Sequence, residues 1–227
     1  MTENPDKWCF AWFAEKQPVD SQTKAALVKD SKWQTNEIIT VSFLDGTEHQ
    51  RALVRKFAAE WVTNLANLSF SWSEPPNTDI RISFRYRGSW SVIGTTCRDV
   101  LKSQPTMNFG WLTPDVTEQE ARRVILHEFG HALGLIHEHQ SPIGQIKWDK
   151  PAVIRDLSGP PNDWDLATIQ HNMFDAYPPN EIAGTRLDKN SIMMYPIPAS
   201  WTTDGFSSGF NNELSPQDKI FIRQQYS

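Results

Sequence analysis

The sequence predicts an α+β fold, and three observations support this prediction. The first half of the chain contains β-branched or alternating segments, typical of strands, together with two segments of helical periodicity. The second half carries eight prolines between residues 142 and 198, which predict loops and short helices. A chain of 227 residues can also form a substantial hydrophobic core without disulfide or metal staples. A metal bound by this chain would therefore not be needed for folding and could serve a function.

The composition excludes several classes of protein. Hydrophobic residues make up 39% of the chain, charged residues make up 22%, and no apolar run approaches the length of a membrane span. With a net charge of -5 and no stripe of Lys and Arg, we expect neither a nucleic acid nor a membrane as partner, and we expect a monomer. The N-terminus lacks the pattern of a secretory signal, so either the chain is not exported by that route or a signal was removed. The cellular location of the protein therefore stays open.

Five segments of the first half predict individual elements. Residues 37–44, EIITVSFL, predict a strand that ends at an Asp-Gly turn. Residues 47–67 repeat apolar side chains every four positions and predict an amphipathic helix. Strands are expected at 68–73 and at 79–87, where apolar and polar residues alternate. A further short strand is expected at 106–112, TMNFGWL, which contains a glycine.

Two helix starts are marked by capping residues. Thr117 and Glu120 fit a capping box, in which each side chain bonds the backbone amide of the other residue. The last helix begins after Ser215, with Pro216 at its first position. The core-facing positions of the helix that follows Thr117 are predicted to be Ala121, Ile125, Phe129, Ala132 and Ile136.

The segment that begins at His127, HEFGHALGLIHEH, contains four of the six histidines of the chain. Positions i and i+4 of a helix share one face, so His127 and His131 can bind the same metal ion. Gly134 can adopt a left-handed conformation, which would end the helix and return His137 as a third ligand. Three protein ligands leave the open fourth position of a catalytic zinc site. Glu128 can then reach a metal-bound water without being a ligand.

The spacing of this segment is specific. The pattern HExxHxxGxxH should arise by chance in a chain of this composition with odds of roughly 10⁻⁵, which disfavours the alternative of histidines that are only solvated on a helix surface. His49 and His171 lie in polar stretches and are predicted to be solvated. For His139 two alternatives stay open: it is exposed, or it orients a group near the site.

These motifs resemble those of a known family. HExxHxxGxxH is the metzincin signature of zinc endopeptidases, and Glu138 directly after His137 resembles the astacin branch. Downstream, residues 191–195, SIMMY, resemble the astacin Met-turn S-x-M-x-Y, although many astacins have His at the position of Met194. The resemblance covers residues 37–227, and the chain is similar to compact bacterial and fungal astacin-like proteins.

The resemblance implies a metzincin fold with two lobes. Residues 37–137 would form an N-terminal lobe with a twisted, mostly parallel sheet and two long helices. Residues 138–227 would form an irregular C-terminal lobe of the same catalytic domain, with the zinc cleft between the lobes. Residues 106–112 would be the edge strand that pairs with an extended peptide substrate, or else an ordinary structural strand. Met193 would pack under the metal.

The resemblance also implies a function, a zinc endopeptidase with one catalytic Zn²⁺ that acts on polypeptides. Glu128 would be the general base for a zinc-activated water. Tyr195 would bind zinc in the resting enzyme and then stabilise the oxyanion, the alternative being a plain buried tyrosine. In processed astacins the residue at Glu138 is associated with the new N-terminus, so its partner here stays open.

Several alternatives remain at this stage. One is a catalytically silent zinc-binding module, against which the presence of Glu128 argues. Another is a zinc exopeptidase or amidase, which the glycine, the third histidine and the Met-turn disfavour. Residues 1–36 are predicted to form a leader with a possible regulatory role, because Cys9 could occupy the fourth zinc position. Cys9 could instead form a disulfide with Cys97 or remain a buried free thiol.

Overall fold

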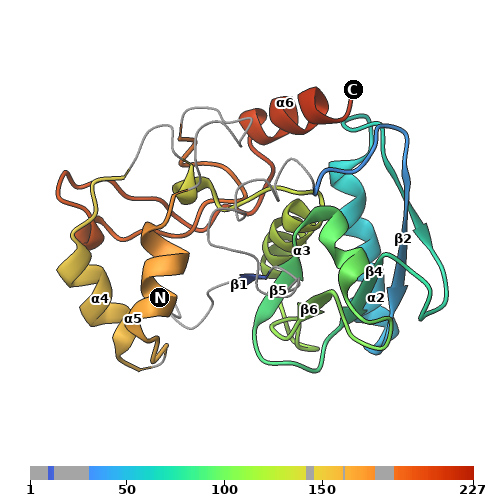
Figure 1. The fold of residues 1–227 in the computed structure, drawn as a ribbon, viewed down its shortest axis with the longest axis horizontal. Coiled ribbons are helices and arrows are strands. Elements are labelled where there is room, and N and C mark those ends of the chain that lie inside the picture. Colours follow the sequence, from blue (N-terminus) through green and yellow to red (C-terminus); the bar gives the residue numbers. More distant parts are fainter. Residues whose placement is uncertain (1–9, 13–30, 142–145, 161, 177–186) are drawn as a thin grey trace.

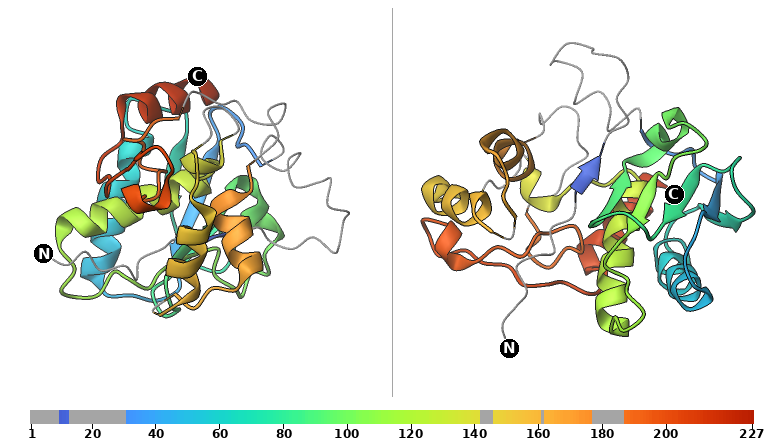
Figure 2. Two further views of the ribbon diagram at one scale, coloured as in Figure 1. Left: turned by 90° about the vertical axis from the view of Figure 1, so that its left-hand side faces the viewer. Right: turned by 90° about the horizontal axis from the view of Figure 1, so that it is seen from below.

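The computed structural model describes residues 10–12, 31–141, 146–160, 162–176 and 187–227 (Figure 1). A six-stranded sheet and the helices α2 and α3 form one lobe, while α4 and α5 lie on the far side of α3 from α2 (Figures 1 and 2). Within the described ranges, each helix is either too short or too polar to span a membrane. The predicted α+β class is confirmed.

The sheet is mostly parallel, as expected. Its strands are ordered β1-β5-β6-β4-β2-β3, and only β5 and β6 pair in the antiparallel sense. The bounds are β1 Phe10–Trp12, β2 Ile38–Phe43, β3 Ser69–Trp72, β4 Ile80–Ser83, β5 Ser89–Val92 and β6 Met107–Phe109.

The prediction that residues 106–112 form the edge strand is wrong. The strand β6 lies inside the sheet, where Met107 pairs with Ile82 of β4 on one side and with Ser91 of β5 on the other. The strand β5 was missed because its pattern is inverted. Ser89 and Ser91 are buried while the tryptophan between them is only half-buried, so polarity does not report the buried face.

Two helices cover this sheet. Helix α2, Glu48–Ala58, begins with a capping box between Thr47 and Gln50 and continues as a short 3₁₀ helix, Ala59–Trp61. The helix is shorter than the predicted 47–67, because Trp61 turns inward to donate to the Leu126 carbonyl and Asn64 has a positive φ of 59°. Helix α3, Glu118–Ala132, begins after Thr117, and of the predicted capping box the bond from the Glu120 amide to the Thr117 hydroxyl is confirmed.

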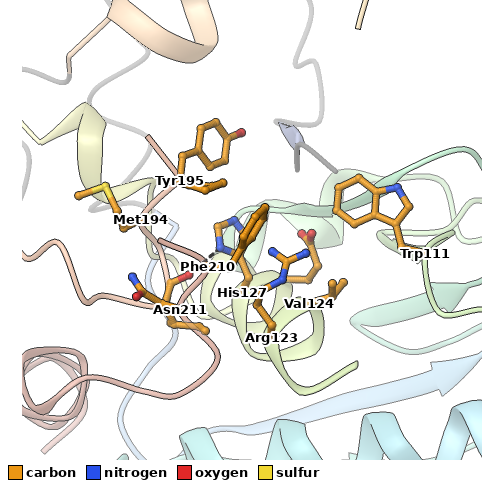
Figure 3. A pocket seen from close by; sticks show the side chains of 11 residues that line it. Trp111, Arg123, Val124, His127, Met194, Tyr195, Phe210 and Asn211 are labelled. Atoms are coloured by element: carbon orange, nitrogen blue, oxygen red, sulfur yellow. Dashed lines mark hydrogen bonds between the residues drawn. The ribbon is translucent and has the colours of Figure 1, made fainter. Parts of the chain in front are cut away.

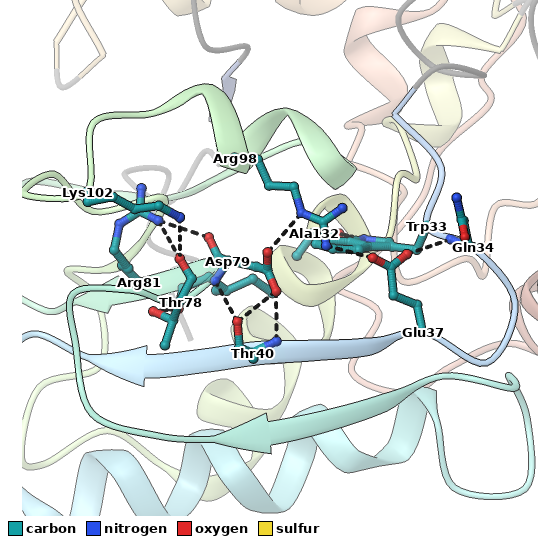
Figure 4. A network of polar contacts seen from close by, with 11 residues as sticks. Trp33, Gln34, Glu37, Thr40, Thr78, Asp79, Arg81, Arg98, Lys102 and Ala132 are labelled. Atoms are coloured by element: carbon teal, nitrogen blue, oxygen red, sulfur yellow. Dashed lines mark hydrogen bonds and ion pairs between the residues drawn. The ribbon is translucent and has the colours of Figure 1, made fainter.

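A polar network ties the strand ends to the loop before β6 (Figure 4). Arg98 bridges the carboxylates of Glu37 and Asp79 at 2.6 and 2.8 Å. Arg81 is fully buried and donates to the carbonyls of Thr78, Gln104 and others. A buried guanidinium is tolerated because its donors are satisfied by hydrogen-bond acceptors.

The second half is irregular, as the prolines predict. It contains α4 Lys150–Ser158, α5 Leu166–Ile169 with a π-helical extension Gln170–Phe174, and α6 Pro216–Gln225. Short 3₁₀ helices occupy Glu138–Gln140 and Ala199–Trp201, and a further one, Gly94–Asp99, lies in the first half of the chain. One hydrophobic cluster fills the lobe of the sheet, and a second surrounds α4 and α5. Ile192, Met193 and Tyr226 belong to the first cluster, so the second half of the chain contributes to both.

The segment predicted as a leader lies partly outside the described residues, and this includes Cys9. The structure describes Phe10–Trp12, which form the edge strand β1 beside β5. Near the end of the segment, Trp33 is buried in the core and donates to the Ala132 carbonyl. Cys97 is a buried free thiol, and burial raises its pKa to about 12.

Candidate active site

The structure brings three predicted ligands together at the C-terminal end of α3. His127 and His131 lie one turn apart, with ring centroids 4.8 Å from each other. Gly134 has a φ of +94°, so the chain turns back here as predicted and His137 returns to the helix. The candidate ligand atoms of His127, His131 and His137 all lie within 4.8 Å of one another, and the three residues are buried.

Backbone carbonyls orient two of these rings. The Nδ1 atoms of His127 and His131 lie 2.8 Å from the carbonyls of Ile192 and Leu135, to which they donate. A ring whose Nδ1 donates carries a free lone pair on Nε2, the tautomer that binds a metal. The Nε2 atoms of His131 and His137 accordingly face each other at 3.1 Å.

The geometry and protonation of the three histidines fit zinc. Two nitrogens bound tetrahedrally at 2.0–2.1 Å lie about 3.3 Å apart, close to the separation of the His131 and His137 nitrogens. The Nε2 atom of His127 is buried and has no hydrogen-bond partner among the described residues. Burial lowers the pKa of His131 to about 4 and holds the pKa values of His127 and His137 well below 6.5. The imidazoles are therefore neutral near pH 7, as metal binding requires.

Glu128 lies beside this group on α3, and its side chain is fully buried. It lines a hollow of about 370 Å³, counting the part open to solvent, that is also lined by His127 (Figure 3). The walls of this hollow also include Trp111, Arg123, Val124, Tyr195 and Phe210. The hollow therefore places a carboxylate and one residue of the candidate metal site next to a space that is open to solvent.

Arg123 was not singled out from the sequence. It lies one helical turn before His127, and its guanidinium donates twice to Glu120 at 2.8 and 2.9 Å. The same group lies 5.1 Å from the ring centroid of Phe210. The i,i+4 spacing from His127 was the available signal for its position in the wall.

The predicted Met-turn lies directly under the site. Met193 is buried and packs against α3 at Gly130, where a Cβ atom added to the glycine would lie 2.3 Å from the Met193 Sδ atom. Trp61 closes the same space, at 3.2 Å from that Cβ position. Gly130 was treated as a variable position of the motif, although a glycine inside a helix is itself a signal of close packing.

Tyr195 is buried next to the histidines. Its ring centroid lies 4.2 Å from that of His137 and 4.7 Å from that of His139. The structure therefore brings this predicted site residue to the metal group.

His139, for which two alternatives were open, is buried and not exposed. Its Nε2 atom lies 2.7 Å from the Asn172 carbonyl, and its ring stacks on that of Tyr195. Burial lowers the pKa of His139 to about 4, so the ring is neutral near pH 7. His171, in contrast, lies near the surface, 3.7 Å from Asp175.

The structure also supplies a partner for Glu138. One carboxylate oxygen of Glu138 accepts from the Asp188 backbone amide at 2.9 Å, while the Glu138 amide donates to the Met193 carbonyl. Burial, with smaller contributions from the nearby carboxylates of Asp218 and Asp188, raises the pKa of Glu138 to about 7. The segment after His137 is thus attached to the Met-turn.

The comparisons with known proteins agree with this site. The family model for astacin, which describes a family of peptidases, matches residues 26–204. A structure of myroilysin has 40% sequence identity and a TM-score of 0.85, over 88% of this chain and 97% of that chain. A crystal structure of myroilysin has 36% identity and a TM-score of 0.69, over 98% and 91%.

A more distant match shows the fold alone. High choriolytic enzyme 1, a hatching enzyme zinc-protease from the medaka fish Oryzias latipes, has 17% identity and a TM-score of 0.59, over 87% of this chain and 95% of that chain. The comparison with curated proteins gave no match.

Proposed function

Because the chain belongs to the astacin family and is therefore a zinc metalloendopeptidase, we propose that His127, His131 and His137 hold one catalytic zinc ion and that Glu128 is the general base. One observation carries this proposal: three buried, neutral imidazoles have their candidate ligand atoms within 4.8 Å of one another, beside a buried carboxylate. When bound, zinc supplies Lewis acidity, which activates water and polarises a peptide carbonyl.

The position of Glu128 suits proton transfer. The ligand group contains the three imidazoles and not Glu128, although Glu128 follows His127 directly on α3. Its carboxylate can accept a proton from the attacking water and later deliver that proton to the leaving amine. Tyr195, with its ring against His137, is proposed to be a zinc ligand in the resting enzyme and afterwards to donate a hydrogen bond from its hydroxyl to the developing oxyanion.

The substrate is proposed to bind as an extended strand. Since β6 is interior, we propose that the substrate pairs with its neighbour β5, whose outer edge is paired with β1 in the structure. A segment of the predicted leader therefore occupies the edge that a substrate would use. We propose that residues 1–36 regulate access to the site in this way.

The test is the Glu128→Gln variant, assayed for casein cleavage and zinc content. Loss of cleavage is expected, with zinc near one ion per chain, because the base is removed and the ligands stay. Glu118→Gln is the matched control, since Glu118 is exposed on the same helix and pairs with Lys56. Mass spectrometry of the fragments should show internal cuts.

Three outcomes would contradict the proposal. Loss of zinc in Glu128→Gln would make Glu128 a ligand. Full activity in that variant would exclude it as the base. A zinc-loaded wild-type chain that cleaves no peptide would instead favour the silent zinc-binding module.

A further inference from the structure

A carboxylate from the last helix is bonded to the Met-turn. Asp218, in the first turn of α6, is buried and accepts three hydrogen bonds. The donors are the Ser191 hydroxyl at 2.7 Å, the Ile192 amide at 2.9 Å and the Ser215 amide at 2.9 Å. Two of the three donors therefore belong to the Met-turn and one to the helix cap.

The same segment of backbone holds a proposed zinc ligand. The carbonyl of Ile192 lies 2.8 Å from Nδ1 of His127. The amide and the carbonyl of Ile192 thus connect Asp218 to the ring of His127. In addition, the Ser191 hydroxyl that donates to Asp218 accepts from the Met193 amide at 3.0 Å, so the turn is fixed at three consecutive residues.

We propose that Asp218 is a positioning residue for zinc binding, because it fixes the Ile192 carbonyl that orients His127 toward the metal. A backbone carbonyl selects the metal-binding tautomer of a histidine only while it stays within hydrogen-bond distance. The bonds from Ile192 and Ser191 to Asp218 hold it there. This inference rests on the proposed role of His127 as a zinc ligand.

The role differs from ordinary helix capping. The α6 cap needs only the reciprocal bonds between Ser215 and Asp218. The bonds to Ser191 and Ile192 contribute nothing to that cap. They join residues that are 26 and 27 positions apart. The two roles can therefore be separated by mutation.

The experiment compares the zinc affinity of Asp218→Ala, Asp218→Asn and Ser215→Ala in the full chain. Affinity is measured by competition with a chromophoric chelator, and tryptophan fluorescence verifies folding. Ser215→Ala removes the cap hydroxyl of the same helix and leaves the Met-turn bonds of Asp218 in place. Loss of an outer partner of a ligand costs about 10–100-fold in metal affinity. We expect at least a ten-fold weaker affinity for Asp218→Ala and less than a three-fold change for Ser215→Ala.

Asp218→Asn tests the geometry without leaving a void. Its amide oxygen can accept from both backbone amides, but its NH₂ group then faces the Ser191 hydroxyl, which can no longer donate. We expect a zinc affinity between those of the wild type and Asp218→Ala. The ¹⁵N signal of the His127 Nδ1–H group should shift in both Asp218 variants and stay unchanged in Ser215→Ala.

The proposal is overturned if a folded Asp218 variant keeps the wild-type zinc affinity, or if Ser215→Ala weakens zinc equally. Should Asp218→Ala fail to fold, Asp218→Asn alone decides between these outcomes. A wild-type chain that binds zinc but cleaves nothing would refute the proposed catalytic function and leave this comparison intact.

Discussion

At Gly130, helix α3 has no space for a side chain. A glycine inside a helix is about 1 kcal/mol less favourable than alanine, so its presence between two proposed zinc ligands destabilises the helix. The glycine allows the close approach of Met193, whose sulfur would lie 2.3 Å from a Cβ atom at this position. The histidine motif of α3 and the Met-turn thus fit together because Gly130 has no side chain.

Gly130→Ala should destabilise the protein, although alanine is the better helix former. Met193 is buried and Trp61 closes the other side, so overpacking of about 1–3 kcal/mol should exceed the gain in helix propensity. Thermal unfolding of the metal-free protein measures this, with Gly209→Ala as the control, because no atom lies within 4 Å of that Cβ position. An unchanged or higher melting temperature would show that Met193 moves away without cost.

At the scale of elements, the end of α3 is capped by two distant segments. The Trp33 indole donates to the Ala132 carbonyl at 2.8 Å, and the Tyr226 hydroxyl donates to the Leu133 carbonyl at 2.7 Å. The last carbonyls of a helix lack partners within the helix, and these two lie immediately before the turn at Gly134. Residues near both ends of the described chain therefore fix the place where the chain turns back to His137.

Tyr226→Phe should weaken this end of α3 while leaving the ring in place. Loss of one buried hydrogen bond is expected to cost about 1 kcal/mol, or roughly 2–4 °C in melting temperature for a chain of this size. Urea unfolding measures the change. Tyr86→Phe is the control, because Tyr86 is half exposed. Equal effects of the two variants would mean that the Tyr226 hydroxyl contributes nothing specific.

The elements also show which features can be predicted from sequence. Strands β2 and β3, helix α3 and helix α6 follow local patterns of polarity or capping, and they lie where those patterns indicate. The three histidines were predictable because their spacing is set by one helix and one glycine turn. Strand β5 was not predictable, because Ser89 and Ser91 are buried while Trp90 between them is half-buried, so the polarity of the residues does not mark the buried face.

The contacts around the site depend on tertiary structure as well. The burial of His139 and the bonds of Asp218 to the Met-turn join segments that are far apart in the sequence. No periodicity within either segment specifies such a contact. Local patterns therefore predict the proposed ligands, while the residues that contact them become visible only in the folded chain.

At the scale of the whole molecule, four buried histidines should make the metal-free protein sensitive to acid. Burial lowers the pKa of His131 and His139 to about 4, and it holds the pKa values of His127 and His137 well below 6.5. Below about pH 6.5 the unfolded chain therefore binds protons that the folded chain does not, and stability falls as pH falls. Glu138 opposes this trend. Because its pKa is about 7 in the folded chain, the folded chain binds a proton between about pH 7 and pH 4.5 that the unfolded chain does not bind.

Four groups outweigh one, so the free energy of unfolding should decrease between pH 6.5 and pH 5, by on the order of 3 kcal/mol per pH unit. Urea unfolding after chelation measures this slope. His139→Gln should lower the slope by about one proton, because one of the four histidines is removed. A stability that rises on acidification would contradict the burial of these rings.

The predicted leader bears on the accessibility of the whole site. A strand attached to the same chain competes with substrate at an effective concentration in the millimolar range, whereas a peptide substrate is present at far lower concentration. Pairing of Phe10–Trp12 with β5 should therefore inhibit cleavage of long peptides. Deletion of residues 1–12 should raise kcat/KM at least ten-fold at unchanged zinc content.

Deletion of residues 1–9 is the matched control, since it removes Cys9 and keeps the residues of β1. If strand pairing is the inhibitory contact, this shorter deletion should leave the activity low. Full activation by the shorter deletion would place the inhibition in the first nine residues, as the latency hypothesis for Cys9 requires. A short peptide substrate that does not reach β5 should respond less than a long one to deletion of residues 1–12, because only an extended chain competes with β1 for the same backbone groups.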